Sequence, residues 1–396
     1  MTATYLAASS TAGLRLTENT PTTPTVENLA LPAEGTTRQS TALPRTRLRR
    51  AKMAYTTRFF AEQLEHDADG HELVRGPDVT PRAGDLVLAK VLEIGKHARL
   101  ESPHSRRQVL FPGDEIVVAY GHRYAPDQFE AEVPEDLQVT NLVAAGGLAG
   151  RVTAQHASID KATVIEPLGL IACDGVVLNL AGLAPHHVQR HPNRRPGRRP
   201  RLVTVLGTSM NSGKSTTLAC LINGLTAAGL SVAAGKATGT GAGGDPRMFA
   251  DAGSGTVLDF TDFGHGCTYR LGYADLKALV LSVMAALSNA DTDVVVLEIA
   301  DGIYQGETSR LIADPEVQAW IDTLVFAAGD ALGATKGVDL LAEHGLQVAA
   351  VSGVVTASPL ASREADAVLP VSLVPTYDLT APEVACEVLG HDARRV

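Results

Sequence analysis

The amino-acid sequence predicts an α/β protein whose main domain is a doubly wound, mostly parallel sheet, preceded by a small β-rich domain and a disordered N-terminal tail. Three observations lead to this prediction. Strand-like apolar runs alternate with helix-like stretches after residue 201, short apolar runs separated by turn residues fill 84–185, and residues 1–52 hold few large apolar side chains. Alternating strands and helices are typical of βαβ units, whereas closely spaced short strands are typical of a barrel or sandwich.

The predicted main domain spans residues 202–396. Its helix-like stretches, at 214–229, 273–290 and 334–345, separate apolar runs whose lengths fit buried strands. Such runs are typical of parallel sheets covered by helices, and the shortage of aromatic side chains, 4% of the chain, leaves alanine, valine and leucine to fill the interior. The strands are expected at 202–207, 230–235, 255–260, 293–300, 322–328 and 346–353.

The chain before residue 84 divides into two predicted segments. Residues 1–52 are rich in Thr, Ala, Pro and Ser, a composition that cannot offset the entropy lost on ordering, so we expect a disordered tail. A start of the natural chain at Met53 is one interpretation of the change in composition that follows. Residues 53–83 are expected to be a short helical or linker segment, with one apolar helix face made by Phe59, Phe60 and Leu64.

The segment 84–185 predicts a small β-rich domain. Gly-Asp and Pro-Gly turns separate its short apolar runs, which favours a barrel or a sandwich. Aromatic and polar side chains gather in one stretch of a chain that is otherwise poor in aromatics. These residues are either the core of the small domain or a wall that covers a ligand: Tyr120, His122, Arg123, Tyr124 and Phe129.

Residues 186–201 form a predicted linker to the main domain. The segment contains six arginines and three prolines and has no apolar periodicity. Two interpretations are open, because such a run is either a solvated linker or a strip that attracts anionic ligands.

Bulk properties exclude several functional classes. The formal net charge of −10 argues against broad nucleic-acid binding, which needs a basic surface. No apolar run approaches the roughly 18 residues that a membrane span requires, and no secretion signal opens the chain. We therefore expect a cytoplasmic protein that binds neither nucleic acid nor membrane. The cysteines form no CxxC pair and indicate neither a zinc site nor a disulfide framework: Cys173, Cys220, Cys267 and Cys386.

One loop has a chemical signature. A β-branched apolar run ends at Gly207, and a glycine-bracketed turn leads from it into the helix expected at 214–229. Backbone N–H groups of such a turn, together with the helix N-terminus, bind phosphates. Lys214 is expected to reach the β and γ phosphates and Ser215 to offer a hydroxyl to Mg²⁺. The predicted nucleotide-binding residues are Gly207, Thr208, Asn211, Ser212, Gly213, Lys214, Ser215 and Thr216.

This loop departs from the strict pattern G-x-x-x-x-G-K-[ST], because Thr208 stands at the first glycine position and Gly207 precedes it. The resulting pattern, GTxxxxGK[ST], resembles that of dethiobiotin synthetase and related P-loop nucleoside triphosphatases (NTPases). Those relatives include cobyrinic acid diamide synthases and an uncharacterised group of P-loop proteins. The resemblance covers residues 202 to about 390. It implies ATP, Mg²⁺, a small-molecule substrate and a homodimer.

The resemblance also implies roles for residues beyond the loop. Lys236 and Thr240 would lie near the phosphates and the substrate. Asp259, with Asp262 as the alternative, takes the place of an acidic residue of the family, and Glu298 takes that of the glutamate in its Walker-B-like strand. The implied catalytic residues are Lys214, Lys236 and Glu298, and the implied Mg²⁺ ligands are Ser215, Asp259 and Glu298. Other readings stay open, since Glu298 could cap a helix or pair with a lysine and Asp259 could form a turn.

The glycine-rich segments 239–249 and 259–272 are expected at the carboxyl ends of strands, where open α/β sheets bind ligands. Arg247 or Arg270 either binds a substrate carboxylate or is an ordinary surface arginine. His265 and Cys267 are either a base and a nucleophile or packing residues.

These inferences predict an ATP-dependent, Mg²⁺-requiring enzyme that activates a small carboxylate-type metabolite by phosphoryl transfer, as a ligase or cyclo-ligase. A small-molecule kinase needs the same residues and stops one step earlier. A GTPase or ATPase switch in cofactor delivery and a degraded scaffold are further alternatives. The base preference is open, because Ser352-Gly353 replaces the asparagine with which the family reads adenine, and the NKxD-type motif that reads guanine is missing.

Overall fold

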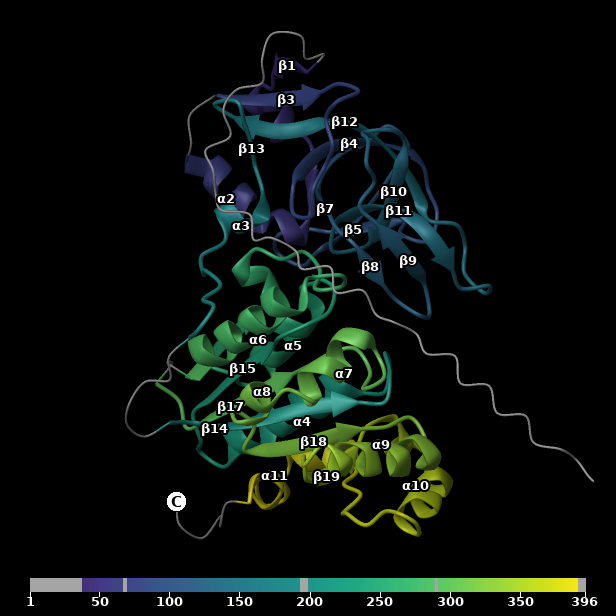
Figure 1. Ribbon diagram of the computed structural model, residues 1–396, viewed down its shortest axis with the longest axis vertical. Helices are drawn as coiled ribbons and strands as arrows, with labels where there is room; N and C mark the ends of the chain where they lie inside the picture. The colour runs from purple at the N-terminus through teal and green to yellow at the C-terminus, as the bar shows by residue number, and fades with distance from the viewer. Residues whose placement is uncertain (1–37, 67–69, 193–198, 289–290, 391–396) are drawn as a thin grey trace, which may run out of the picture. The chain divides into compact units, whose positions relative to one another are not determined.

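The computed structural model describes residues 38–66, 70–192, 199–288 and 291–390 (Figure 1). These residues belong to one compact unit, 37–396. An N-terminal sheet of short strands comes first along the chain, and an α/β domain follows it. Among the described residues, no helix combines the length and the apolar character that a membrane span requires.

Five strands of the N-terminal sheet close into a barrel. In ring order they are β4 (Leu86–Glu93), β7 (Glu115–Tyr120), β11 (Leu148–Gln155), β10 (Thr140–Ala144) and β12 (Thr163–Cys173). The ring closes because β12 also pairs with β4. Neighbours are antiparallel except β7 and β11, which are parallel. Of the two predicted architectures for the β-rich domain, the described strands form the barrel.

Further elements surround this ring. β3 (His71–Arg75) pairs with β12, and the hairpin of β8 (Arg123–Tyr124) and β9 (Phe129–Glu132) extends from β11. The remaining elements are β1 (Gln39–Ala42), α1 (Arg45–Leu48), β2 (Lys52–Met53), η1 (Tyr55–Thr57), α2 (Arg58–His66), β5 (Arg99–Glu101), β6 (Arg107–Val109), β13 (Val176–Val177) and α3 (Leu180–Leu183).

Alternation along the barrel strands explains why both of their faces are buried. On β4, Val87 and Ala89 face the barrel interior, whereas Leu86 and Leu88 face an outer cluster that Phe60 and Leu64 of α2 help to form. Successive side chains of a strand point to opposite faces, so one strand supplies two cores.

One sequence prediction for this region needs correction. The disordered tail was expected to extend to residue 52, but β1 pairs with β3 and β2 pairs with β7. Leu43 and Leu48 bury their side chains in the outer cluster, and this packing stabilises a segment whose composition alone favours disorder. The segment 53–83, expected to be helical or a linker, contains the helix α2, in which Phe60 and Leu64 are buried as predicted, and also the strand β3. The rest of the predicted tail, 1–37, lies outside the described residues.

The α/β domain is built on six parallel strands. Their order across the sheet is β16 (Thr256–Asp259), β15 (Val232–Lys236), β17 (Val294–Glu298), β14 (Arg201–Gly207), β18 (Thr323–Ala327) and β19 (Val348–Ser352). All five neighbouring pairs are parallel. Each predicted strand of the main domain is present, with ends that differ by a few residues.

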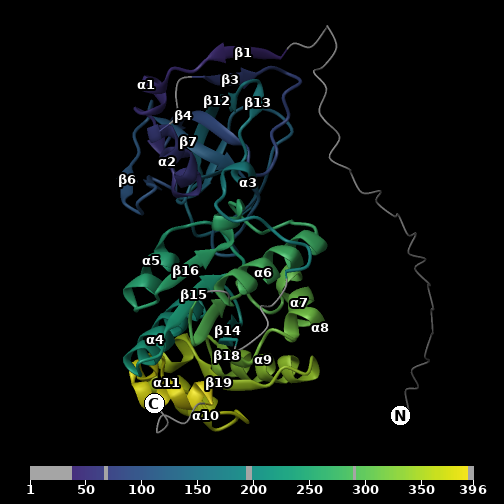
Figure 2. The same ribbon diagram turned by 90° about the vertical axis from the view of Figure 1, so that its left-hand side faces the viewer.

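Helices pack on both faces of this sheet, as Figure 2 shows, so the predicted doubly wound arrangement is confirmed. Leu202 and Leu206 of β14 face one cluster, whereas Val203 and Val205 face the other. The first cluster contains α6 (Tyr273–Ser288), α7 (Gly306–Ile312), α8 (Pro315–Gln318), α9 (Ala331–Glu343) and α10 (Pro359–Asp366). The second contains α4 (Lys214–Ala227), α5 (Gly244–Asp251) and α11 (Pro382–Leu389).

The described ends of the predicted linker 186–201 contact the α/β domain. The His186 ring stacks on Phe263 with centroids 5.2 Å apart, and Arg199 forms a bidentate pair with Asp322 at 2.5 and 2.7 Å. Residues 193–198, which hold three of the six arginines, lie outside the described residues.

Candidate functional site

The predicted phosphate loop connects β14 to α4 at the carboxyl end of the sheet. Two of its residues have a left-handed backbone, Asn211 with φ 65° and Gly213 with φ 97°. The early glycine of the pattern is explained by crowding, because a Cβ at Gly207 would lie 2.4 Å from the Ser212 hydroxyl oxygen and 2.8 Å from Lys214 Cγ. The departure from the strict motif therefore preserves a tight turn.

Polar groups of this loop point inward. Lys214 is buried, and its Nζ donates to the carbonyl oxygen of Ser209 at 2.8 Å. The buried Ser212 hydroxyl has no hydrogen-bond partner among the described residues. An unpaired buried hydroxyl is costly unless a ligand or water completes it. The loop thus has the donors that a phosphate group needs.

Ser215 and Glu298 lie together, as predicted. Glu298 ends β17, which is the neighbour of β14, and register places it opposite Val205. The Ser215 hydroxyl, in the first turn of α4, donates to the Glu298 carboxylate at 2.7 Å. Glu298 is only 1% exposed. A buried carboxylate must be paired, and here the partners are this hydroxyl and a lysine on the next strand.

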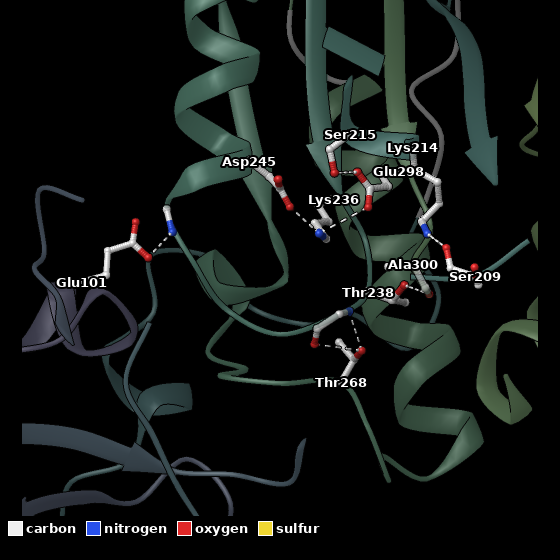
Figure 3. A network of polar contacts seen from close by, with 12 residues as sticks. Glu101, Ser209, Lys214, Ser215, Lys236, Thr238, Asp245, Thr268, Glu298 and Ala300 are labelled. Carbon is white, nitrogen blue, oxygen red and sulfur yellow. Dashed lines mark hydrogen bonds and ion pairs between the residues drawn. The ribbon is translucent and has the colours of Figure 1, made fainter. Parts of the chain in front are cut away.

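That lysine is Lys236, the last residue of β15. Its Nζ lies 3.3 Å from a Glu298 carboxylate oxygen and also contacts Asp245 (Figure 3). Burial by itself would lower the pKa of Lys236, but the two carboxylates outweigh burial and raise this pKa above its ordinary value. Lys236 is therefore a permanent positive charge beside the loop.

Asp245, in the first turn of α5, is a site residue that sequence reasoning missed. The glycine run before it hid the start of a helix, although Asp-Pro directly after glycines is a common helix N-terminus and was the signal available. Asp301 was also missed. Burial raises its pKa, while Lys214 and Lys236 counteract that rise through their charges.

Asp259, predicted as a metal ligand, ends β16 opposite Lys236 of β15, but its carboxylate makes local contacts. Its carboxylate accepts from Thr261 N at 2.7 Å and caps the short helix η2 (Phe260–Phe263). Asp262, the alternative, pairs with Arg58 of the barrel side at 2.7 Å. No described hydrogen bond or ion pair joins either acid to Ser215 or Glu298, and the local contacts of the Asp259 carboxylate are those of the turn-forming alternative. The physical reason is local, because a free N–H at the start of η2 attracts this carboxylate.

The remaining groups fit a magnesium ion. Mg²⁺ prefers oxygen ligands and is held by one or two carboxylates together with substrate phosphates and waters. Ser215, Glu298 and Asp245 supply such oxygens around Lys236. Among the residues described, no group of three or more His, Cys, Asp or Glu side chains forms a metal site.

The arginines considered for substrate binding contact the barrel. Arg270 pairs with Glu132 of β9, and Arg247 Nε donates to the Ser105 hydroxyl at 3.4 Å. Cys267 Sγ accepts from Tyr269 N at 3.4 Å, and burial raises the pKa of its thiol. A thiol with a raised pKa is a poor nucleophile at neutral pH, which favours packing over catalysis.

Residues of the stretch 120–129 lie in two environments. Tyr120 and Phe129 are fully buried in the barrel, whereas the Tyr124 ring packs against Tyr269 with centroids 5.3 Å apart. At the tip of the same hairpin, Asp127 accepts from the side-chain amide of Asn211 in the phosphate loop at 3.0 Å. The β8–β9 hairpin is thus a wall beside the loop.

Ser352 cannot read a base. Its side chain is fully buried, and its hydroxyl is 3.0 Å from that of Thr376 in η4 (Thr376–Thr380). Gly353 packs behind the phosphate loop, because a Cβ there would lie 2.4 Å from the Ser212 carbonyl oxygen. This pair supports the loop instead of contacting a nucleotide base.

The parallel sheet, the glycine-bracketed loop between β14 and α4, and the Ser215–Glu298 pair define the P-loop NTPase class of nucleotide-binding proteins. No protein-family model matches the sequence, and no curated protein sequence does. Solved structures do match part of the chain.

One is the signal recognition particle 54 kDa protein from Aeropyrum pernix K1 in complex with GDP, 18% identical with a TM-score of 0.33. The match covers 53% of the present chain and 50% of the Aeropyrum protein, so the present chain spans half the length of that protein. Another is the signal recognition particle receptor FtsY from Elizabethkingia anophelis, 15% identical, TM-score 0.31, covering 53% and 69% of the two chains. FtsY from Thermotoga maritima is 14% identical, with a TM-score of 0.28 and coverage of 54% and 65%. The assignment to the class rests on this chain's own sheet and loop.

Proposed function

We propose that the chain is a Mg²⁺-dependent enzyme that transfers the γ-phosphoryl group of ATP to a small carboxylate, as a ligase or cyclo-ligase of the dethiobiotin synthetase type. The observation that carries the proposal is the second lysine. A phosphate loop uses one lysine, here Lys214, on the β and γ phosphates. Lys236 adds a buried cation at the end of a neighbouring strand, between Glu298 and Asp245.

A permanent cation at this place suits acceptor binding. An attacking carboxylate and a triphosphate repel each other, and Lys236 reduces that repulsion while it orients the acceptor oxygen. Because its pKa is raised, Lys236 acts through its charge and not as a base. The charges of Lys214 and Lys236 act on the carboxyl group of Asp301, and its negative charge would help to balance these two cations.

The reaction balances as follows. A carboxylate oxygen attacks the γ-phosphorus, the bond from that phosphorus to the β–γ bridging oxygen breaks, and ADP leaves with its electron pair. The resulting acyl phosphate is attacked by an amine at the acyl carbon, which releases inorganic phosphate and one proton. Lys214 and the loop amides hold the triphosphate during the first step, and bound Mg²⁺ supplies neutralisation of phosphoryl charge.

The test traps the acyl phosphate with hydroxylamine. Purified protein is incubated with ATP, Mg²⁺, hydroxylamine and a panel of small mono- and dicarboxylates, and hydroxamate and ADP are measured. We expect hydroxamate with at least one acid, loss of all turnover in Lys214→Ala, and loss of hydroxamate with retained nucleotide binding in Lys236→Gln. Lys336→Gln, on the exposed face of α9, is the matched control.

ATP hydrolysis that yields no hydroxamate and that Lys236→Gln leaves unchanged would overturn the transfer reaction. Such a result would favour the alternative of a nucleotide-dependent switch. A parallel series with GTP tests the base preference, since the Ser352 side chain is buried against Thr376 and is not available to a base.

A further inference from the structure

A cavity of about 510 Å³ lies between the barrel and the loop that follows β15. Its barrel wall includes Lys96, His97, Arg99, Arg107 and Arg123, and its other wall includes Gly241, Ala242 and Gly244. This volume is within the range of pockets that hold small metabolites.

The charge of the cavity is strongly positive. Four of its side chains are cations, and none of the four forms an ion pair with a residue that the structure describes: Lys96, Arg99, Arg107 and Arg123. The lining contains one carboxylate, that of Glu101, which is occupied by accepting from Gly243 N at 3.1 Å. In a chain with a formal net charge of −10, such a concave cationic surface is a local exception.

Arg123 is the residue that most requires a ligand. It is only 9% exposed, yet its Nε has no hydrogen-bond partner among the described residues. Its one described side-chain hydrogen bond is long, 3.4 Å from Nη2 to the side-chain oxygen Oε1 of Gln128. A buried guanidinium without an anion is strongly unfavourable, and its planar fork matches a carboxylate or phosphate in two-point contact.

The cavity adjoins the catalytic groups. The stretch from Gly241 to Gly244 forms its wall and leads directly to Asp245, whose carboxylate contacts Lys236. Figure 3 shows Glu101 on the barrel side of this stretch and Lys236 beyond it. Arg123 also lies within electrostatic range of Asp301, whose pKa the charges of Lys214 and Lys236 lower against the effect of burial.

We propose that this cavity binds the acceptor of the phosphoryl group, and that the acceptor is a small molecule with at least two acid groups. One acid group pairs with Arg123 and the surrounding barrel cations, and a second is presented to Lys236. The identification of the bound molecule as the acceptor rests on the proposed function, whereas the binding of a small polyanion does not. The barrel thereby has a role as the substrate-selecting part of the enzyme.

The test measures anion binding directly, without nucleotide, by isothermal titration calorimetry at low salt. Probes are succinate, citrate, glutamate and inorganic phosphate, with acetate as a single-charge comparison. We expect at least one polyanion to bind at least tenfold more tightly than acetate. Arg123→Gln should weaken that binding about tenfold or more, Arg123→Lys less, and Arg107→Gln severalfold. Arg106→Gln, the neighbouring arginine outside the cavity lining, should change it less than twofold.

Arg123→Gln removes a buried charge, so circular dichroism melts accompany each variant, and the exposed Arg107→Gln tests the cavity if Arg123→Gln does not fold. Equal binding by all variants, or no difference between polyanions and acetate, would overturn the site. Tight, salt-sensitive binding of a single-stranded oligonucleotide that Arg123→Gln abolishes would instead assign the cavity to nucleic acid and overturn the small-molecule proposal.

The two proposals fail separately. Polyanion binding that persists in Lys214→Ala while hydroxamate never forms would retain the cavity site and remove the transfer reaction. Hydroxamate formation that Arg123→Gln leaves unchanged would retain the reaction and remove the cavity as the acceptor site.

Discussion

The Ser215 hydroxyl donates a 2.7 Å hydrogen bond to the carboxylate of Glu298, which ends the strand next to the one that leads into the phosphate loop. The loop residue and the Walker-B-like acid are therefore joined directly to each other. Parallel register produces this contact, since Glu298 ends β17 and the loop that leads to Ser215 leaves the carboxyl end of the neighbouring strand β14.

Replacing Glu298 with Gln should reduce Mg²⁺-dependent ATP turnover about 100-fold or more, because an amide binds a metal ion weakly and leaves the charge of Lys236 less balanced. Nucleotide affinity measured without Mg²⁺ should change less than about threefold, since the loop amides and Lys214 are untouched. Glu343→Gln, in an exposed pair on α9, is the control. Unchanged turnover would remove Glu298 from the metal site.

Asp245→Asn and Asp259→Asn test which of the two acids acts in the site. The structure places Asp245 beside Lys236, whereas the sequence predicted Asp259 as a Mg²⁺ ligand. Asp245→Asn is expected to lower turnover at least about tenfold through loss of a charge beside Lys236. Asp259→Asn should leave turnover within about threefold and destabilise the fold by about 1 kcal/mol, as expected for a weakened helix cap. Steady-state kinetics and urea denaturation measure the two effects. The reverse pattern would restore Asp259 as the metal ligand.

The difference between these two acids shows what the sequence could and could not predict. Gly207 to Thr216, Lys236 and Glu298 follow strands whose apolar runs are unambiguous, and each occupies the predicted end of its strand. Asp245 lies at the start of a helix after a glycine run, where local signals favour a loop. Its position depends on a barrel residue, Glu101, which binds the backbone at Gly243 across 142 positions of sequence.

The ordered conformation of residues 39–53 could not be predicted either, for a related reason. Their composition favours disorder, and only contacts with Phe60 and the barrel strands make burial of Leu43 and Leu48 possible. For Arg123 the sequence left a core and a ligand wall open as alternatives, and its neighbours Tyr120 and Phe129 are core residues. Which side of a short strand faces a cavity follows from the closure of the barrel, and closure has no local sequence signal.

Asp127→Asn should increase nucleotide affinity about two- to fivefold at low salt. The Asp127 carboxylate lies at the phosphate loop, where it accepts from Asn211, and a like charge opposes an incoming triphosphate. Asparagine keeps an acceptor for that hydrogen bond while it removes the charge. Fluorescence titration with a labelled nucleotide measures the change. Asp136→Asn, which breaks an exposed pair with Arg151 on the same barrel, should have no effect, and an equal response of both variants would assign the change to net charge.

His97 should make the fold acid-sensitive. Burial, and then the charge of Arg123, lower the pKa of His97 to about 4, whereas an unfolded histidine titrates near about 6.5. A histidine kept neutral in the folded state contributes stability above the unfolded pKa and loses it as pH falls toward the folded one. We expect a loss of about 2 kcal/mol between about pH 7 and pH 5 from this group.

The denaturation midpoint should therefore depend less on pH in His97→Asn than in the native protein. His104 is exposed in the same region, and His104→Asn should keep the native pH dependence. Binding of a polyanion beside Arg123 should raise the pKa of His97, which the imidazole proton resonances report. Midpoints of the native protein that are independent of pH would contradict a buried neutral His97.

Gly146→Ala should impair catalysis from the barrel. A Cβ at Gly146 would lie 2.0 Å from the Gly241 carbonyl oxygen and 3.2 Å from Ala242 Cα, so the cavity wall between Gly241 and Gly244 must shift. That shift moves Asp245 relative to Lys236, and displacements of about 1 Å near reacting groups cost up to about 100-fold in rate. We expect turnover to fall at least about tenfold with nucleotide affinity nearly unchanged, because the phosphate loop lies on other strands. Gly182→Ala, where a Cβ meets no atom within 4 Å, should behave as the native protein. If Gly146→Ala kept full turnover, the close approach of barrel and loop would not be what positions Asp245.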